Sequence, residues 1–483
     1  MAKTQRVRTV MFIPACPEGY KRTGPPLGIG YIASILLKEG YNVQIVDPSP
    51  LNLSLFDIKK IVQNEQPDVV GIYCSSTDRY EAFDLANAVK EVLPNALVVM
   101  GGPHVTATAS ITLQRFSSID VIVRHEGELT MKELLSVINR GGNIGTVKGI
   151  SFRRNQEIVS TPSREFIEDL DSLPPPAYHL YPPFSRYSPQ GIGGEKCDGI
   201  IMSSRGCTFS CPFCYAPNFW GRKFRGRSPK SVVNEMEYQR DEFGVEFIDF
   251  SDDTFTLDMV RAERICDEII KRKVDLTFPI LSRVDTINRN LLKKLKDAGC
   301  EQIQYGVETG SPRLLKSIQK GITVERIEKV LRWTKEAGIQ NHVFLMQGLP
   351  GETVKDVELT FGFLKRNRKF IDKMHSTIAV MLPGTALYER AKRLGLIDDE
   401  VWFSYRSDHP FLSRDPSLRH LPLYLENSEL EELIKFHRLT SILFHMRKRP
   451  YKLAMRDILG YAWNYWKSPE EYLDLIEYLF KFA

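Results

Sequence analysis

Two series of alternating strand and helix patterns limit what this chain can fold into. In the first series, which ends near residue 142, short runs rich in β-branched apolar residues alternate with helical patterns, as in "RTVMFIP" followed by "PLGIGYIASILLKEG". Unbroken Val and Ile runs that are joined through helices indicate a parallel sheet covered on both faces. We therefore predict a doubly wound, Rossmann-like α/β domain over residues 1–146. Ligands of such domains bind at the carboxyl ends of the strands, here the loops 14–27, 74–80, 101–106 and 125–128.

The second series begins at residue 199, after a hairpin and a proline-rich linker over residues 147–198. It contains strand patterns from "GIIMSSRG" to "MHSTIAVMLP", separated by helical patterns. Six β/α units without a seventh or an eighth predict an open, partial (β/α)6 barrel over residues 199–385. Residues 386–483 are expected to form a mainly helical region.

Composition and charge exclude several classes of protein. The chain has 483 residues, of which 42% are hydrophobic and 26% are charged, as in a globular protein of two or three domains. The net charge of +5 is too small for its length to indicate nucleic-acid binding. No apolar run approaches the roughly 20 residues that span a bilayer, and "MAKTQRVRTV" lacks the apolar core of a secretory signal. We expect a cytoplasmic protein without a transmembrane segment.

Three of the eight cysteines, Cys207, Cys211 and Cys214, lie close together in "SSRGCTFSCPFCYAP". They follow the first strand of the predicted barrel, at the rim where barrel enzymes have their active sites. A closed metal site normally needs four protein ligands. The C-x3-C-x2-C spacing lets three thiolates bind three irons of a 4Fe–4S cluster and leaves the fourth iron for a substrate or cofactor. The alternative is a zinc site completed by Cys197 or a distant His, which this spacing suits less well.

The cysteine motif, with Phe213 before its last cysteine, resembles that of the radical S-adenosylmethionine (SAM) superfamily. The resemblance covers about residues 199–385. It implies that SAM binds the open iron and is cleaved to a 5′-deoxyadenosyl radical by the reduced cluster. The SAM-binding residues that it implies are Phe213, Asp252, Asp253, Ser282, Arg283, Glu308 and Gln347. Asp252 and Asp253 stand where the superfamily more often has Gly-Gly-Glu, and each could instead cap a helix.

The first domain resembles the cobalamin-binding fold, with "CSST" after its third strand and "GGPH" after its fourth. Hydroxyl groups and glycines suit the close approach of the cofactor's nucleotide tail to the backbone. The cobalamin-binding residues that the resemblance implies are Leu27, Gly28, Ser75, Ser76, Thr77, Gly101, Gly102, His104, Glu126 and Gly127. Cobalamin carriers with an axial histidine have Asp-x-His-x-x-Gly after the first strand, but this chain has "IPACPEGYKR". No histidine of that loop can bind cobalt. The alternative is a plain nucleotide-binding or structural domain of the flavodoxin type.

The domain order and the segments "PPLGIGYIA", "GGPHVT" and "RHEGELT" resemble those of cobalamin-dependent (class B) radical SAM enzymes. The resemblance implies a C-methyltransferase that methylates an unactivated carbon, using a 5′-deoxyadenosyl radical and methylcobalamin. It also implies a low-potential electron donor such as a ferredoxin or flavodoxin. Three alternatives remain: a non-methylating member such as an oxidative cyclase or rearrangement enzyme, a cobalamin-free radical SAM enzyme, and a non-catalytic cobalamin or iron–sulfur sensor.

The substrate is expected to be a small molecule, a lipid or a peptide, and the protein a monomer. The C-terminal segment "ILFHMRKRPYKLAMRDILGYAWNYW" mixes cations and aromatic residues. It could contact the substrate, although a packed amphipathic helix with a solvated basic face is favoured.

Overall fold

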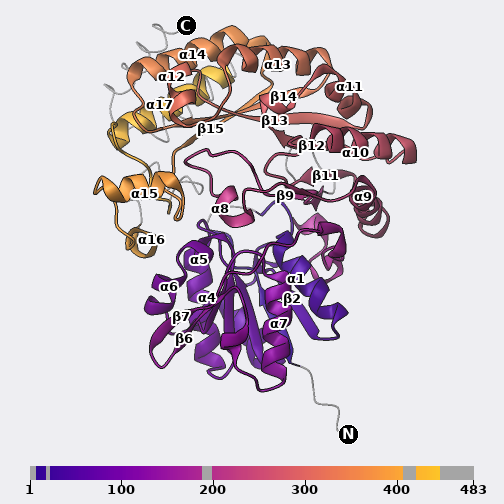
Figure 1. The fold of residues 1–483 in the computed structure, drawn as a ribbon, viewed down its shortest axis with the longest axis vertical. Helices are drawn as coiled ribbons and strands as arrows, with labels where there is room; N and C mark the ends of the chain where they lie inside the picture. Colours follow the sequence, from indigo (N-terminus) through magenta and orange to yellow (C-terminus); the bar gives the residue numbers. More distant parts are fainter. Residues whose placement is uncertain (1–6, 18–21, 188–197, 406–419, 447–483) are drawn as a thin grey trace. The chain divides into compact units, whose positions relative to one another are not determined.

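The computed structural model describes residues 7–17, 22–187, 198–405 and 420–446 (Figure 1). The chain divides into two compact units, and each unit contains segments that are not consecutive in the sequence. The first unit contains Met1–Thr208, Tyr215–Asp253 and Lys271–Thr277. The second contains Phe209–Cys214, Thr254–Ile270 and Phe278–Ala483. The first unit therefore includes the beginning of the predicted barrel as well as the N-terminal domain.

A seven-stranded sheet with the order β2-β1-β3-β4-β5-β6-β7 forms the centre of the first unit. Its strands are β1 (Arg8–Phe12), β2 (Asn42–Val46), β3 (Val69–Tyr73), β4 (Leu97–Gly101), β5 (Val121–Val123), β6 (Ile150–Arg154) and β7 (Glu157–Ser160). The first five strands pair in parallel, whereas β6 and β7 pair in antiparallel fashion at the edge. The predicted hairpin exists, but it continues the sheet instead of standing apart from it.

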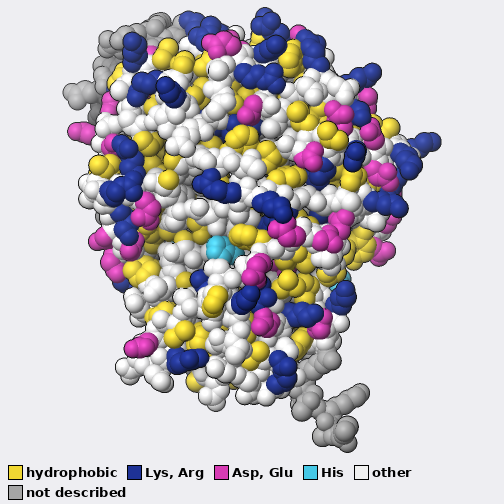
Figure 2. All heavy atoms as spheres, viewed as in Figure 1, with side chains coloured by type: hydrophobic (Ala, Val, Ile, Leu, Met, Phe, Trp, Pro, Cys, Tyr) yellow, Lys and Arg dark blue, Asp and Glu magenta, His cyan; other side chains and the backbone are white. Residues whose placement is uncertain are grey.

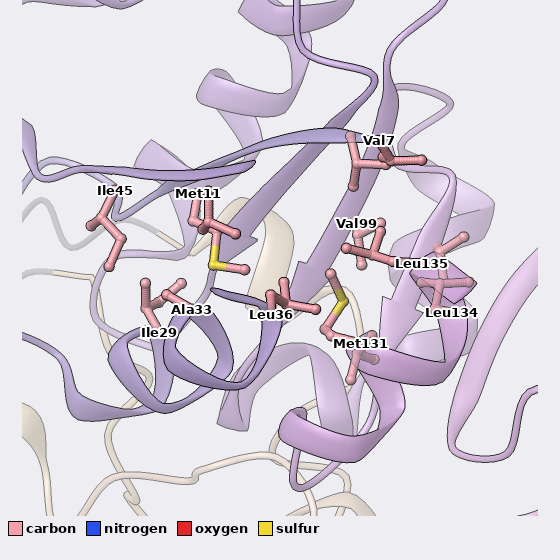
Figure 3. Packing of buried hydrophobic residues seen from close by; sticks show 14 of the residues in the cluster. Val7, Met11, Ile29, Ala33, Leu36, Ile45, Val99, Met131, Leu134 and Leu135 are labelled. Atoms are coloured by element: carbon pink, nitrogen blue, oxygen red, sulfur yellow. The ribbon is translucent and has the colours of Figure 1, made fainter. Parts of the chain in front are cut away.

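Helices cover both faces of this sheet, as a doubly wound fold requires. They are α1 (Leu27–Lys38), α2 (Pro48–Leu51), α3 (Leu55–Glu65), α4 (Arg79–Val92), α5 (Pro103–Ala107), α6 (Ala109–Arg115) and α7 (Glu128–Asn139). The sequence analysis did not foresee α5 and α6. Helices α1 and α7 pack against each other, and α3 packs against α4. Figure 3 shows the core beneath the first pair, where Ala33, Leu36, Met131 and Leu135 meet Val99 of β4.

The proline-rich segment that follows β7 is packed by its tyrosines. It contains the 3-10 helices Leu170–Ser172, Tyr178–Leu180 and Phe184–Arg186. Tyr178, Tyr181 and Tyr187 are all buried. The Tyr181 hydroxyl donates to the Pro26 carbonyl over 2.6 Å. The prolines of the segment do not predict these tyrosine anchors, which fix it to other elements of the first unit.

The six strands predicted for the partial barrel are present, and they form two separate sheets. In the first unit β8 (Asp198–Ile201) pairs with β11 (Phe247–Phe250). In the second unit β12 (Phe278–Ser282), β13 (Cys300–Glu308), β14 (Gln340–Gln347) and β15 (Lys373–Ile378) form one sheet in that order. Thr277, just before β12, bridges in parallel to Phe247 of β11. The intervening helices are α9 (Pro229–Phe243), α10 (Met259–Arg272), α11 (Arg289–Asp297), α12 (Pro312–Ser317), α13 (Val324–Glu336) and α14 (Val354–Asn367).

Among the described residues after β15, the second unit contains the helices α15 (Ala386–Arg393), α16 (Val401–Ser404) and α17 (Leu430–Met446), in agreement with the expected helical region. Helix α17 packs on β14 and β15. The basic and aromatic segment singled out above lies outside the described residues from position 447 onward. Within the described ranges, no helix combines the length and the apolar run needed to cross a membrane. On the face drawn in Figure 2, basic and acidic side chains are intermixed.

Candidate active site

The cysteine motif forms a loop between two short elements, of which the first lies within the predicted strand 199–206. Strand β9 (Ser204–Arg205) precedes it and helix α8 (Ala216–Trp220) follows it, while β9 pairs with β10 (Arg225–Gly226). Gly206 has φ +90°, and a Cβ there would lie 2.2 Å from the Lys223 carbonyl oxygen. Only glycine fits this close contact, which fixes the backbone immediately before the first cysteine.

The three cysteines of the motif form no disulfide. Cys207 is buried, whereas Cys211 and Cys214 are half-buried. Three thiolates suit an iron–sulfur cluster that keeps one iron open. Among the described residues, no three His, Cys, Asp or Glu side chains are already grouped as metal ligands. The assignment of the cluster to these cysteines therefore stays a prediction.

A cavity of about 560 Å³ lies within the first unit, among the carboxyl ends of its parallel strands. Six of the residues predicted to bind cobalamin line it, namely Leu27, Gly28, Gly101, Gly102, Glu126 and Gly127. Its wall also contains Tyr215, Phe219 and Trp220, which directly follow the cysteine motif. Asp253, predicted to bind SAM, lines it too. One cavity thus brings together residues that were predicted for two different cofactors.

Two glycines shape this cavity in different ways. Gly102 has φ +116°, and a Cβ there would lie 2.5 Å from the Cys74 carbonyl oxygen. A Cβ on Gly28 would meet no atom within 4 Å and would point into open space. Gly102 therefore lets two backbone segments approach each other, whereas Gly28 leaves room for a ligand. These features fit a large cofactor whose tail runs along the backbone.

The other four residues predicted for cobalamin, Ser75, Ser76, Thr77 and His104, do not line the cavity. The Ser75 backbone N–H donates to Asp78 Oδ1 over 2.7 Å. Ser76 Oγ lies 3.1 Å from His104 Nδ1. Burial lowers the pKa of His104, so its imidazole is neutral. These contacts join the loop after β3 to helix α5, and a role at the cofactor stays a prediction for all four residues.

A buried cluster of charges lies beside the cavity. Glu126 Oε1 accepts from Arg205 Nη1 over 2.7 Å and from Arg225 Nη1 over 2.8 Å. Glu128 Oε1 accepts from Arg205 Nη2 over 2.6 Å. All four side chains are at most 4% exposed. Although burial opposes its charge, Glu128 and Glu126 keep the pKa of Arg205 above its usual value.

The sequence analysis named Glu126 but missed the rest of this cluster. Glu128 stands in "RHEGELT", a segment that was quoted for its resemblance, so a signal for it was present. Arg205 and Arg225 gave no such signal, because their pairing depends on the register of β9 against β10. Tyr215, Phe219 and Trp220 could have been suspected from their aromatic character next to the cysteines.

The two aspartates after β11 have different surroundings. Asp252 accepts hydrogen bonds from the Ser203 backbone N–H over 2.6 Å and from the hydroxyls of Ser203 and Ser204. It therefore anchors the segment that leads into the cysteine motif. Asp253 faces the cavity, and its burial and the nearby Asp252 raise its pKa to about 6. Of the two, Asp253 is better placed to meet a ligand.

Arg283 lies at the end of β12 in the second unit, next to an aromatic residue of the cysteine motif. Its guanidinium forms two hydrogen bonds of 2.9 Å with the Asp285 carboxylate. The guanidinium carbon lies 3.5 Å from the centre of the Phe209 ring, a cation–π geometry. The neighbouring Ser282 hydroxyl is engaged by Thr256 and Thr286. Arg283 thus contacts the motif itself, whereas Ser282 belongs to a local hydroxyl network.

The remaining SAM candidates also belong to the second unit. Glu308 ends β13 with φ +65°, and its carboxylate accepts from Lys320 Nζ over 2.6 Å. Gln347 ends β14 and donates from Nε2 to Thr440 Oγ1 of α17 over 2.7 Å. Phe213 packs against two apolar clusters that share Met346. A positive φ on a non-glycine residue is strained and is more frequent at functional sites. Glu308 is therefore the strongest candidate for SAM binding among these three residues.

Comparisons with known proteins decide the family. The family model of the B12 binding domain matches residues 20–135, and that of the radical SAM superfamily matches residues 201–364. An uncharacterized methyltransferase of Pyrococcus horikoshii is 34% identical over 456 residues, which cover 94% of this chain and 95% of the relative. The chain belongs to the cobalamin-dependent radical SAM family. Its cofactors are a 4Fe–4S cluster, SAM and cobalamin.

Two further proteins show the range of this family. The anaerobic magnesium-protoporphyrin IX monomethyl ester cyclase of Rubrivivax gelatinosus is 31% identical, over 70% of this chain and 61% of the relative. The methyltransferase TsrM of Kitasatospora setae, solved with cobalamin and a 4Fe–4S cluster, has a TM-score of 0.67 at 20% identity, over 80% of this chain and 75% of that protein. The predictions of the α/β fold, of the family and of a radical SAM enzyme are confirmed.

Proposed function

We propose that this member of the cobalamin-dependent radical SAM family methylates an unactivated carbon atom of an organic substrate. The observation that carries the proposal is the cavity of the first unit. Its wall combines Gly101 and Gly102 of the cobalamin-binding fold with Tyr215 and Phe219, which follow the cysteine motif. A methyltransferase is also named among the relatives that match nearly the whole chain.

When bound, the three cofactors supply a methyl group from cobalamin and a SAM-derived radical that abstracts a hydrogen atom from the substrate. The chain's own task is to position these groups and to exclude water, because a radical that meets solvent is lost. Tyr215, Phe219 and Trp220 give one side of the cavity an aromatic wall. Burial raises the pKa of Tyr215 far above its usual value, so its hydroxyl stays protonated and uncharged.

Specific residues are proposed to hold the cofactors. Cys207, Cys211 and Cys214 would hold the cluster. Gly28 would allow cobalamin to approach the backbone closely, and Gly102, Glu126 and Gly127 would line its site. For SAM, Arg283 suits a carboxylate because its guanidinium is a planar, permanent cation, and Asp253 suits an ammonium group. Phe213, Glu308 and Gln347 are the further proposed SAM contacts.

The test is a product count under anaerobic conditions. The reconstituted protein would be incubated with a low-potential reductant, SAM carrying a deuterated methyl group, and fractions of small molecules, lipids and peptides from the source cells. Methyl transfer through cobalamin consumes two SAM for each product, so S-adenosylhomocysteine and 5′-deoxyadenosine should form in equal amounts. Mass spectrometry should find the label on a carbon atom of one substrate.

A non-methylating reaction is the second candidate, and one specific finding favours it. The cyclase relative named above is about as similar in sequence as the methyltransferase relative, although over a shorter part of the chain. 5′-Deoxyadenosine without S-adenosylhomocysteine would support a cyclase or a rearrangement enzyme and contradict methyl transfer. A lack of both products in the presence of reductant would support a sensor. The electron donor, the monomeric state and the cytoplasmic location also stay proposals.

A further inference from the structure

The loop between β5 and α7, residues 124–127, contacts both flanks of the cysteine motif. On the N-terminal flank, Glu126 accepts from Arg205, which stands two positions before Cys207. Glu126 Oε2 also accepts from the Ile167 backbone N–H over 2.7 Å. The hydrogen bonds that this carboxylate accepts thus come from buried donors. One of these donors, Arg205, belongs to the strand that leads into the motif.

The charges explain why a carboxylate is needed at this position. Arg205 and Arg225 are directly opposite each other in the β9–β10 pair. Like charges that face each other across two strands destabilise the pair, and burial makes the repulsion stronger. Glu126 binds both guanidinium groups, and Glu128 binds one of them. Two carboxylates therefore balance two cations, and the short ribbon before the motif depends on them.

The C-terminal flank is held by the same loop. His125 Nδ1 lies 3.3 Å from the Phe219 carbonyl oxygen of α8. A carbonyl can only accept, so Nδ1 carries the proton. Arg225, itself bound to Glu126, donates from Nη2 to the Trp220 carbonyl over 2.8 Å. His125 has φ +60°, an uncommon backbone conformation for a residue other than glycine.

The cavity completes the connection. His125, Glu126, Gly127 and Glu128 all line it, and so do Phe219 and Trp220 of α8. A ligand that fills the cavity would restrict the loop from one side, while the ion cluster transmits that restriction to the ribbon and to α8. Two sites that bias one shared element are coupled, and the coupling acts equally in both directions.

We propose that Glu126 is a positioning residue that couples cobalamin binding to the order of the cysteine loop. Cobalamin in the cavity immobilises residues 203–207 and 219–225, which prepares the loop for the cluster, and the assembled cluster in turn tightens cobalamin binding. The inference rests on the proposed function in one respect, which is that cobalamin occupies this cavity.

Hydrogen–deuterium exchange of the cluster-free protein, with and without hydroxocobalamin, tests the coupling. In the wild type, cobalamin should slow exchange in peptides that cover 203–207 and 219–225, by about fivefold or more if the coupling is of ordinary size. Glu126→Gln should lose this protection even at a hydroxocobalamin concentration that saturates the variant. The matched control is Glu133→Gln, in helix α7 directly after this loop, which removes a more exposed ion pair with Arg164. It should behave as the wild type does.

The reciprocal measurement separates coupling from a loss of structure. The Kd of hydroxocobalamin would be measured with and without the reconstituted cluster. The Kd without the cluster, divided by the Kd with the cluster, should exceed one in the wild type and in the control variant. This ratio should approach one in Glu126→Gln. If Glu126→Gln does not fold, Glu128→Gln, which removes one of the two carboxylates bound to Arg205, should reduce the ratio partly.

Three results would overturn the inference. Equal protection of the cysteine loop in the wild type and Glu126→Gln would show that Glu126 transmits nothing. Cobalamin that binds the wild type without protecting the loop would show that the two sites are independent, while leaving the proposed function intact. A wild type that does not bind cobalamin would overturn the proposed function together with the coupling.

Discussion

Gly102→Ala gives the sharpest test of how the cobalamin-binding fold is built. The new Cβ would lie 2.5 Å from the Cys74 carbonyl oxygen and 3.1 Å from the Cys74 nitrogen. Both are backbone atoms, which cannot rotate away as a side chain could. The Cys74 N–H also donates to the Gly101 carbonyl over 2.8 Å, so a shift of this segment disturbs the end of β3 and β4 together.

Two costs contribute to the expected loss of stability. Alanine at φ +116° and ψ 176° occupies a backbone region that costs a non-glycine residue about 1–3 kcal/mol. Overpacking against fixed neighbours typically costs about 1–3 kcal/mol more. The free energy of unfolding should therefore fall by about 2–6 kcal/mol, a large part of the roughly 5–15 kcal/mol that stabilises an ordinary domain.

Urea unfolding of the apoprotein, followed by circular dichroism, measures this loss, and hydrogen exchange in β3 and β4 localises it. Gly101→Ala is the matched control, since its Cβ would make only ordinary contacts, the nearest at 3.6 Å from the Val123 carbonyl oxygen. Gly28→Ala should keep the stability but weaken cobalamin binding, because its Cβ points into open space on the cavity wall. A Gly102→Ala protein as stable as Gly101→Ala would refute the reasoning.

Further outcomes are expected at the other cofactor sites. Replacing the three cysteines of the motif by alanine should abolish the cluster and SAM cleavage, as measured by iron content and product analysis; a full cluster in that variant would mean that other ligands hold it. Arg283→Ala should weaken SAM binding in calorimetry while iron content stays unchanged, and an unaltered affinity would leave Arg283 a structural role. Because burial and Asp252 raise the pKa of Asp253 to about 6, the ionisation of Asp253 lowers stability as the pH rises from the unfolded-state pKa of about 4 to about 6, so Asp253→Asn should stabilise the apoprotein at pH 8 more than at pH 5. Equal effects at both pH values would contradict this. Electron paramagnetic resonance of the cob(II)alamin form should show no axial nitrogen splitting; such a splitting, lost in His125→Ala, would identify an axial histidine.

Much of the fold could be predicted because the information is local. The parallel strands of the first unit follow from unbroken runs of Val and Ile. The segment over 103–115 was missed, because its two short helices lack a long amphipathic pattern. The tyrosines after β7 were missed for a different reason, since only the packed structure shows that Tyr178, Tyr181 and Tyr187 are buried.

The kinds of site in this protein follow from short stretches of its amino-acid sequence. The C-x3-C-x2-C spacing, the glycine pair at 101–102 and the order of the two series identify the cofactors through the families that they resemble, because each of these features depends on residues close together in the chain. Only the tertiary structure could place Asp253 on the wall of the cavity with Gly102, or balance Arg205 and Arg225 with Glu126. The physical reason is that strand register and buried charge pairing depend on residues far apart in the sequence, and no local pattern encodes which of them meet.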